Sequence, residues 1–175
     1  MEVIAPSGDV VTVLRAISRA GFGYQPTKKL AQAAGWKLVD DEFDLGFVAF
    51  EMPLGSTNEV RRLAVEVSES GRSRLAFVAL FSYEEYEVQW EPLDEAYQSL
   101  CQQMANVIGP PSASGEFRYS HRPGWLYSCC WWPLSDTTLI LTQDEFDIQF
   151  GMDVTLWIMP AGTTVEIPVS TTLSP

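Results

Sequence analysis

The side chains that usually carry out covalent catalysis are scarce in this chain. Its one histidine, His121, lies between Ser120 and Arg122, without the glycines of a nucleophile elbow nearby. Nucleophilic catalysis needs a serine or cysteine that such a base activates. We therefore interpret His121 as a solvated loop residue rather than a catalytic base.

The three cysteines do not form a recognisable metal or disulfide site. Cys101 falls in a predicted helix, whereas Cys129 and Cys130 are neighbours in a predicted strand, where adjacent side chains point to opposite faces. Zinc sites need several histidine or cysteine ligands at characteristic spacing. An odd, small number of cysteines is also no disulfide framework. We expect small buried side chains, no metal, and a reducing cytoplasmic location.

Two acidic segments repeat a short sequence. Residues 41–47 read Asp-Glu-Phe-Asp-Leu-Gly-Phe and residues 144–150 read Asp-Glu-Phe-Asp-Ile-Gln-Phe. Neither has the ligand spacing and glycine of a calcium loop, so we interpret each as a turn with solvated acids. Each copy follows one predicted strand and opens another. The echo suggests a tandem duplication of a helix-plus-sheet unit, although two copies are also compatible with coincidence.

Other catalytic patterns are missing. Gly21-Phe22-Gly23 follows a helix and lacks a third glycine, so it is not a dinucleotide fingerprint, and no P-loop is present. The glutamates between residues 84 and 91 could supply acid–base pairs, but any acidic chain offers such pairs. The sequence therefore argues against an enzyme and predicts no cofactor.

Two stretches are candidates for contact with a partner. Residues 83–91 mix acids with aromatic rings, and residues 117–122 carry the only basic side chains after residue 74. Aromatic side chains anchor interfaces and acids steer basic partners. The alternatives are a strand end with inward-packed rings and a solvated tether. The candidate partner-binding residues are Tyr83, Glu84, Glu85, Tyr86, Glu87, Trp90, Arg118, Tyr119, His121 and Arg122.

These residues must be positioned by a mixture of helices and strands. Apolar periodicity and capping signals predict helices over residues 9–20, 28–34 with Thr27 as the cap, and 92–108. Alternating patterns predict strands over residues 36–39, 45–52, 59–67, 74–83, 125–132, 137–142, 146–150, 154–159 and 163–169. Residues 110–124 are predicted to be a long connection, of a length that is often functional or mobile.

The predicted fold class is α+β, with helices packed on one face of a mainly antiparallel sheet. At 175 residues the chain is expected to form a single domain over residues 1–169, with halves 1–83 and 84–169, followed by a frayed tail at 170–175.

The net charge of −12 is unevenly divided. Residues 1–74 carry nine basic and ten acidic side chains, whereas residues 75–175 carry two basic and thirteen acidic ones. Such a chain repels polyanions and anionic bilayers, so nucleic-acid and membrane partners are not expected. The asymmetry predicts either an electrostatic surface for a partner or simple solubility.

Several segments resemble a known family. They are a helix end at 107–111 (Val-Ile-Gly-Pro-Pro), Trp131-Trp132 before a strand, residues 143–148 (Gln-Asp-Glu-Phe-Asp-Ile) and the closing 156–160 (Leu-Trp-Ile-Met-Pro). With them the chain resembles the small acidic immunity proteins of actinobacterial toxin systems, of the type that inhibits the tuberculosis necrotizing toxin, a secreted NAD⁺ glycohydrolase. The resemblance implies a cytoplasmic antitoxin that binds the toxin's catalytic domain one-to-one and blocks its active site.

Two other functions remain open at the level of sequence. The chain could be a small α+β ligand-binding or enzymatic domain with a cleft near the 110–124 loop, using His121 or Glu84–Glu87 as acid–base groups. It could also be an adaptor for secreted effectors that binds an unfolded or signal-bearing segment.

Overall fold

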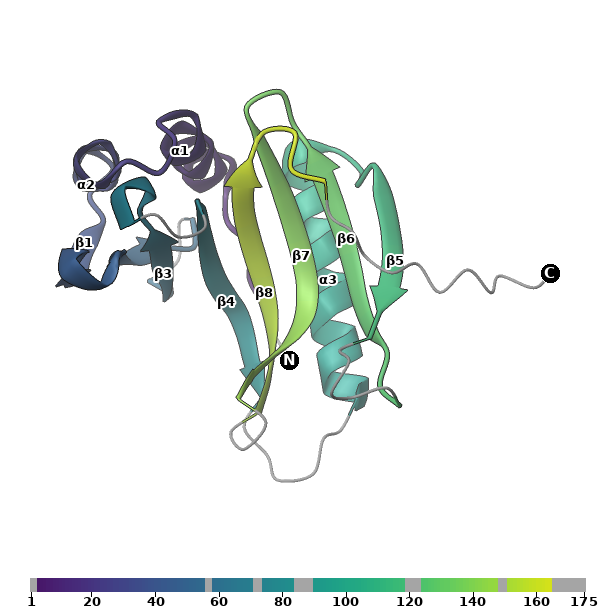
Figure 1. Ribbon diagram of the computed structural model, residues 1–175. Coiled ribbons are helices and arrows are strands. Elements are labelled where there is room, and N and C mark those ends of the chain that lie inside the picture. Colours follow the sequence, from purple (N-terminus) through teal and green to yellow (C-terminus); the bar gives the residue numbers. More distant parts are fainter. Residues whose placement is uncertain are drawn as a thin grey trace.

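The computed structural model describes residues 3–55, 58–70, 74–83, 90–118, 124–147 and 151–164. Within these residues the chain forms three α-helices and an eight-stranded antiparallel sheet (Figure 1). This confirms the predicted α+β class. The sheet is entirely antiparallel, so every connection between neighbouring strands of a meander can be short.

The elements fall into two halves that each begin with helix and continue with four strands. The first half contains α1 (Gly8–Arg19), α2 (Tyr24–Ala33), β1 (Lys37–Glu42), β2 (Phe47–Pro53), β3 (Val60–Glu66) and β4 (Leu75–Tyr83). The second contains α3 (Trp90–Ile108), β5 (Ala113–Phe117), β6 (Tyr127–Pro133), β7 (Thr137–Asp147) and β8 (Gly151–Pro160). The strand order β1-β2-β3-β4-β8-β7-β6-β5 joins two four-stranded meanders through β4 and β8.

The repeated acidic segment does not occupy equivalent positions in the two halves. Its first copy spans the end of β1 and the short 3₁₀ helix η1 (Phe43–Leu45), between the first two strands of its meander. The second copy begins inside β7, the third strand of the other meander, where Asp144 pairs with Asp153 of β8. The turn predicted at Asp144 is therefore wrong, and the strands predicted over 137–142 and 146–150 are one strand as far as Asp147. The β7–β8 ladder reaches Asp147, which lies opposite Gly151, with a register shift between Asp144 and Asp147.

The connection predicted over residues 110–124 contains the edge strand β5. Its five residues pair in register with β6, from Ala113 opposite Trp131 to Phe117 opposite Tyr127. Alanine, serine and glycine have low strand propensity, so the segment has no strand signal of its own. The segment forms a strand because its backbone pairs with the edge of β6, and not because its residues favour strand conformation.

Helix boundaries agree with prediction at α1 and differ at α2. The Ser7 side chain caps α1 by accepting from the Val10 N–H. α2 starts at Tyr24 with Gly23 as its N-cap, several residues before the predicted cap at Thr27, which is buried inside the helix. A proline in the first helical turn lacks only an N–H that would have no helical partner, so Pro26 does not prevent the early start.

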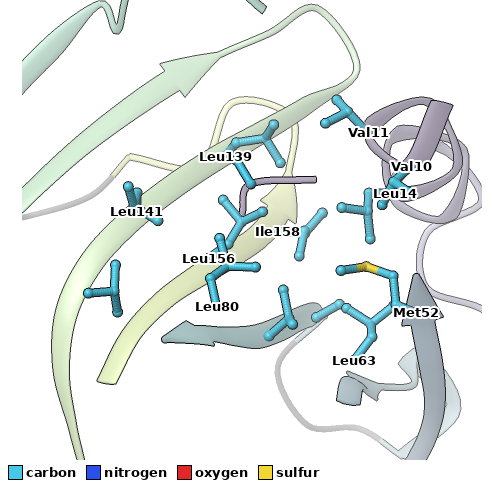
Figure 2. Packing of buried hydrophobic residues seen from close by; sticks show 14 of the residues in the cluster. Val10, Val11, Leu14, Met52, Leu63, Leu80, Leu139, Leu141, Leu156 and Ile158 are labelled. Atoms are coloured by element: carbon cyan, nitrogen blue, oxygen red, sulfur yellow. The ribbon is translucent and has the colours of Figure 1, made fainter. Parts of the chain in front are cut away.

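A single hydrophobic core lies between the helices and one face of the sheet. Figure 2 shows side chains of α1, β2, β3, β4, β7 and β8 meeting there, with Leu14 and Ile158 among them. Both are fully buried, and burying such a side chain stabilises the fold by roughly 1.5–3 kcal/mol. α3 contributes Leu93, Ala96, Leu100 and Met104. Val107, near the end of the same helix, is 40% exposed.

The cysteines behave largely as predicted. Cys130 belongs to the core and its Sγ lies 3.3 Å from that of Cys101, whereas Cys129 lies outside that core cluster and its Sγ donates to the Gly115 carbonyl. All three are free thiols.

Candidate functional site

Most of the predicted partner-binding residues lie outside the part of the chain that the structure describes. Tyr83, Trp90 and Arg118 lie within the described part. The residues outside it are Glu84, Glu85, Tyr86, Glu87, Tyr119, His121 and Arg122. Tyr83 ends β4 opposite Met152 of β8 and is half-buried against the core. It is therefore a packing residue as well as a neighbour of the candidate stretch.

The fold brings the flanks of the two candidate stretches together. β4 and β5 end, and α3 and β6 begin, at the same end of the sheet (Figure 1). The Trp90 ring, at the start of α3, meets the Trp125 ring edge-on with centroids 5.4 Å apart, and lies 5.7 Å from Tyr127. Phe117, beside Arg118, lies 5.4 Å from Tyr127. These four rings, the aromatic cluster, fasten the α3 start to the β5–β6 edge.

Beside the aromatic cluster is an open cleft with a cavity volume of about 480 Å³. Its walls come from α3, β5 and the residues that lead into β6. The residues that line it include Trp90, Asp94, Tyr97, Glu116, Trp125 and Ser128. We call it the aromatic–acidic cleft, since aromatic rings form its sides and two carboxylates reach it.

A buried glutamine fixes one of those carboxylates. Gln143 of β7 is 1% exposed, and its Nε2 donates to Asp94 Oδ1 over 2.6 Å. Its Oε1 accepts from the backbone N–H of Ser128 over 2.8 Å. The side chain thus links β6, β7 and α3, and it holds Asp94 in one orientation at the cleft. Nearby, burial raises the pKa of the Tyr97 phenol, so this side chain is neutral at physiological pH.

The charges around the cleft differ from those in the rest of the molecule. Every ion pair among the described residues uses a basic side chain from residues 15–62. Asp40 and Asp41 are paired with Arg62 and Lys28, for example. No such pair involves the four acids near the start of α3 and on β5, which are Glu91, Asp94, Glu95 and Glu116.

The uneven charge of the sequence therefore becomes a spatial division. Four acids of the first half are paired with basic side chains, which are Asp40, Asp41, Glu51 and Glu59, and Asp136 of the second half is held by Arg15 and Arg19. Arg118 is the one basic residue that the described part of the second half contains. The acidic end of the molecule is thus the end that bears the cleft.

Sequence reasoning found Trp90 and missed most of the cleft. Asp94 and Tyr97 follow Trp90 at helical spacing of four and seven residues, which was a usable signal for one face of α3. Glu116 could not be placed, because β5 was not predicted as a strand, and Trp125, predicted to begin a strand, lies two residues before β6.

A second surface lies on the sheet face that carries no helix (Figure 1). A row of directly opposed residues crosses seven strands there: Ala49, Ala64, Phe77, Trp157, Ile140, Trp131 and Ala113. The Phe77 and Trp157 rings are 5.3 Å apart, and Trp157 Nε1 donates to Thr142 Oγ1. A shallow cavity beside it has charges of both signs, Arg62 and Asp153. This face lacks the one-signed charge of the cleft.

The described residues contain no group of three or more potential metal ligands, and no helix among them is both long and apolar enough to cross a bilayer. Comparison with protein-family models, curated proteins and solved structures gives no match. Function therefore has to be inferred from the residues and their geometry.

Proposed function

We propose that the chain is an immunity protein that binds a folded, basic partner protein through its acidic end. The observation that carries this proposal is the convergence of the aromatic cluster with acids that no described ion pair compensates. Rigid aromatic side chains in a partly desolvated site are the usual anchors of protein interfaces. Surrounding carboxylates attract a positively charged partner and fix its orientation.

The partner proposed is the catalytic domain of a secreted NAD⁺ glycohydrolase, inhibited one-to-one in the cytoplasm of the producing cell. Enzymes that bind an anionic dinucleotide present cationic groups or N–H donors to its phosphates. An acidic protein end is complementary to such a cleft and can occlude it. Charge attraction also speeds encounter, which an antitoxin needs in order to act before the toxin depletes its substrate. The proposed activity requires no catalytic group and no cofactor.

The test is a titration of NAD⁺ hydrolysis by the toxin domain with purified protein. We expect activity to fall linearly and reach zero near one equivalent. The double variant Trp90→Ala with Trp125→Ala should need a large excess to inhibit, because it removes both indole anchors. The helix-free face variant Trp131→Ala is the matched control. Full toxin activity at a several-fold excess of the unmodified protein would refute the proposal.

One observation favours a second candidate, a domain that binds a small molecule. The cleft has a volume typical of ligand pockets, and Glu116 and Gly124 of its lining come from the 110–124 segment. A metabolite panel followed by thermal unfolding separates the two functions. A compound that raises Tm for the unmodified protein, but not for Asp94→Asn with Glu116→Gln, would favour this candidate over the immunity function.

A further inference from the structure

We propose that the aromatic–acidic cleft is a socket for a single arginine side chain of the partner protein. This inference deepens the proposed function and rests on it for the identity of the partner. The chemistry of the socket itself depends only on the cleft. Three features of the cleft point to a guanidinium: flat aromatic walls, two carboxylates from different elements, and a fixed orientation for one of them.

The walls suit a flat cation. Trp90 and Trp125 are half-buried and meet edge-on, so their indoles are held by mutual contact and present surface to the cleft. A guanidinium within about 6 Å of a tryptophan face is attracted by the negative face of the ring. Indoles that are already held in place lose little conformational freedom when the cation enters.

The carboxylates supply the counter-charge. Asp94 accepts a hydrogen bond from Gln143 at Oδ1, and its Oδ2 has no hydrogen-bond partner among the described residues. Glu116 reaches the cleft from β5, where its backbone lies opposite Ser128 of β6. No ion pair of the described residues involves either acid. An arginine has five N–H donors in a planar fork, enough to bond a carboxylate with two of them and still face an indole.

Other occupants fit less well. An apolar group would desolvate two carboxylates without compensating them, which is unfavourable. An anion would be repelled by the same acids. A lysine ammonium carries the charge, but it has no plane to stack on an indole and is more strongly hydrated.

The first experiment uses the protein alone. N-acetyl-arginine amide is titrated at about 0.15 M salt, where long-range attraction is mostly screened, while ¹H–¹⁵N signals of the indole N–H groups are followed. We expect the Trp90 and Trp125 signals to shift in a saturable way and those of Trp131 and Trp157 to stay. N-acetyl-lysine amide should bind several-fold more weakly. Equal binding of the two compounds, or equal shifts at all four indoles, would overturn the arginine socket.

Variants assign the effect to the carboxylates. Asp94→Asn keeps an oxygen that can accept from Gln143, so the fold should be preserved, and it is combined with Glu116→Gln. We expect the pair to weaken arginine amide binding about fivefold or more. Glu91→Gln with Glu95→Gln is the matched control, since it also removes two charges, from residues of α3 that are exposed and do not line the cleft. Equal weakening by the control would contradict the proposal.

The second experiment uses the complex. Each surface arginine of the toxin domain is replaced by alanine, and binding is measured against the unmodified chain and against Asp94→Asn with Glu116→Gln. One toxin arginine should lose most of its contribution in the double variant, so that the two changes are strongly non-additive. Additivity at every arginine overturns the socket even where the toxin is inhibited. If the toxin is not inhibited but arginine amide binds, the proposed partner is wrong and the socket stands.

Discussion

Gln143 shows how one buried polar side chain organises the candidate site. Its amide satisfies the Ser128 N–H and a carboxylate oxygen of Asp94, so three elements depend on it. A buried donor or acceptor left without a partner costs about 1–3 kcal/mol. The orientation of Asp94 and the docking of α3 on the sheet are therefore coupled at this residue.

Replacing Gln143 with leucine should destabilise the protein by about 1–3 kcal/mol, because the Ser128 N–H loses its acceptor and Asp94 its donor. Urea unfolding measures the change, and Gln102→Leu on the exposed face of α3 serves as the control. The control should change the free energy of unfolding by less than about 0.5 kcal/mol. Equal effects of the two replacements would show that the Gln143 bonds do not contribute as described.

The thiols should differ in reactivity. Burial raises the pKa of Cys129 to about 11 and also raises that of Cys130, whereas Cys101 is half-buried. The thiolate is the nucleophile, and at about pH 8 only about 0.1% of Cys129 would be ionised. Brief treatment with iodoacetamide, followed by mass spectrometry of peptides, should find Cys101 modified first. Cys129 reacting as fast as Cys101 would contradict the assigned burial.

At the scale of elements, α1 is tethered to the β6–β7 turn by charge. Arg15 Nε and Nη2 donate to the two carboxylate oxygens of Asp136 at 2.8 and 3.1 Å, and Arg19 lies nearby. The bonds from Arg15 hold the pKa of Asp136 below its ordinary value. A carboxyl group with a lowered folded-state pKa stabilises the fold above its unfolded pKa, and this contribution is lost as the pH falls through the folded value.

Asp136→Asn should therefore lower the free energy of unfolding at neutral pH, and the decrease should become smaller as the pH falls. We expect a deficit of about 1–2 kcal/mol near pH 7, from the loss of charge-assisted hydrogen bonds. Urea unfolding of both proteins at about pH 7, 5 and 3 measures it, and the deficit should shrink below about pH 4 as Asp136 of the unmodified protein becomes protonated. A deficit that is constant across this range would rule out the ionic tether.

Sequence patterns predict most helices and strands of this fold, but not a strand that forms only by pairing with a neighbouring strand. α1 and the strands β2, β3 and β4 have strong periodicity, and they were predicted to within about two residues. β5 was missed because Ala113 to Phe117 form a strand only through pairing with β6. For the same reason the cleft could not be predicted: Trp90 was found from local composition, but its proximity to Trp125 depends on the whole β5–β6 edge.

At the scale of the whole molecule, charge is divided between two ends. Ion pairs compensate Asp40 and Asp41 of β1 and Glu51 of β2, whereas the acids near the cleft have no such described partners. Long-range attraction depends on the local field and not on net charge alone. Two sets of neutralised acids that change the net charge equally should therefore have different effects on association.

We expect the variant with Glu91→Gln, Asp94→Asn, Glu95→Gln and Glu116→Gln to associate with the toxin about tenfold more slowly at low salt. The matched control carries Asp40→Asn, Asp41→Asn, Glu42→Gln and Glu51→Gln, and it should be slowed much less. Stopped-flow association at about 0.02 and 0.5 M salt measures both, and the difference should shrink at high salt. Equal slowing by the two variants would show that only the net charge of the chain matters, and not the position of the acids.

Neutralising Glu84, Glu85 and Glu87 should also slow association with the toxin more than neutralising the acids of residues 40–44.

The central claim is that the acidic end bearing the aromatic–acidic cleft is the surface that binds the toxin. Hydrogen exchange of the backbone amides, with and without the toxin domain, tests it most directly. We predict slower exchange in peptides covering residues 90–98 and 113–128, and no change in peptides covering residues 8–45. Slower exchange confined to residues 8–45, or to strands β2, β3 and β4 at 47–66 and 75–79, would contradict the account if residues 90–128 showed no change.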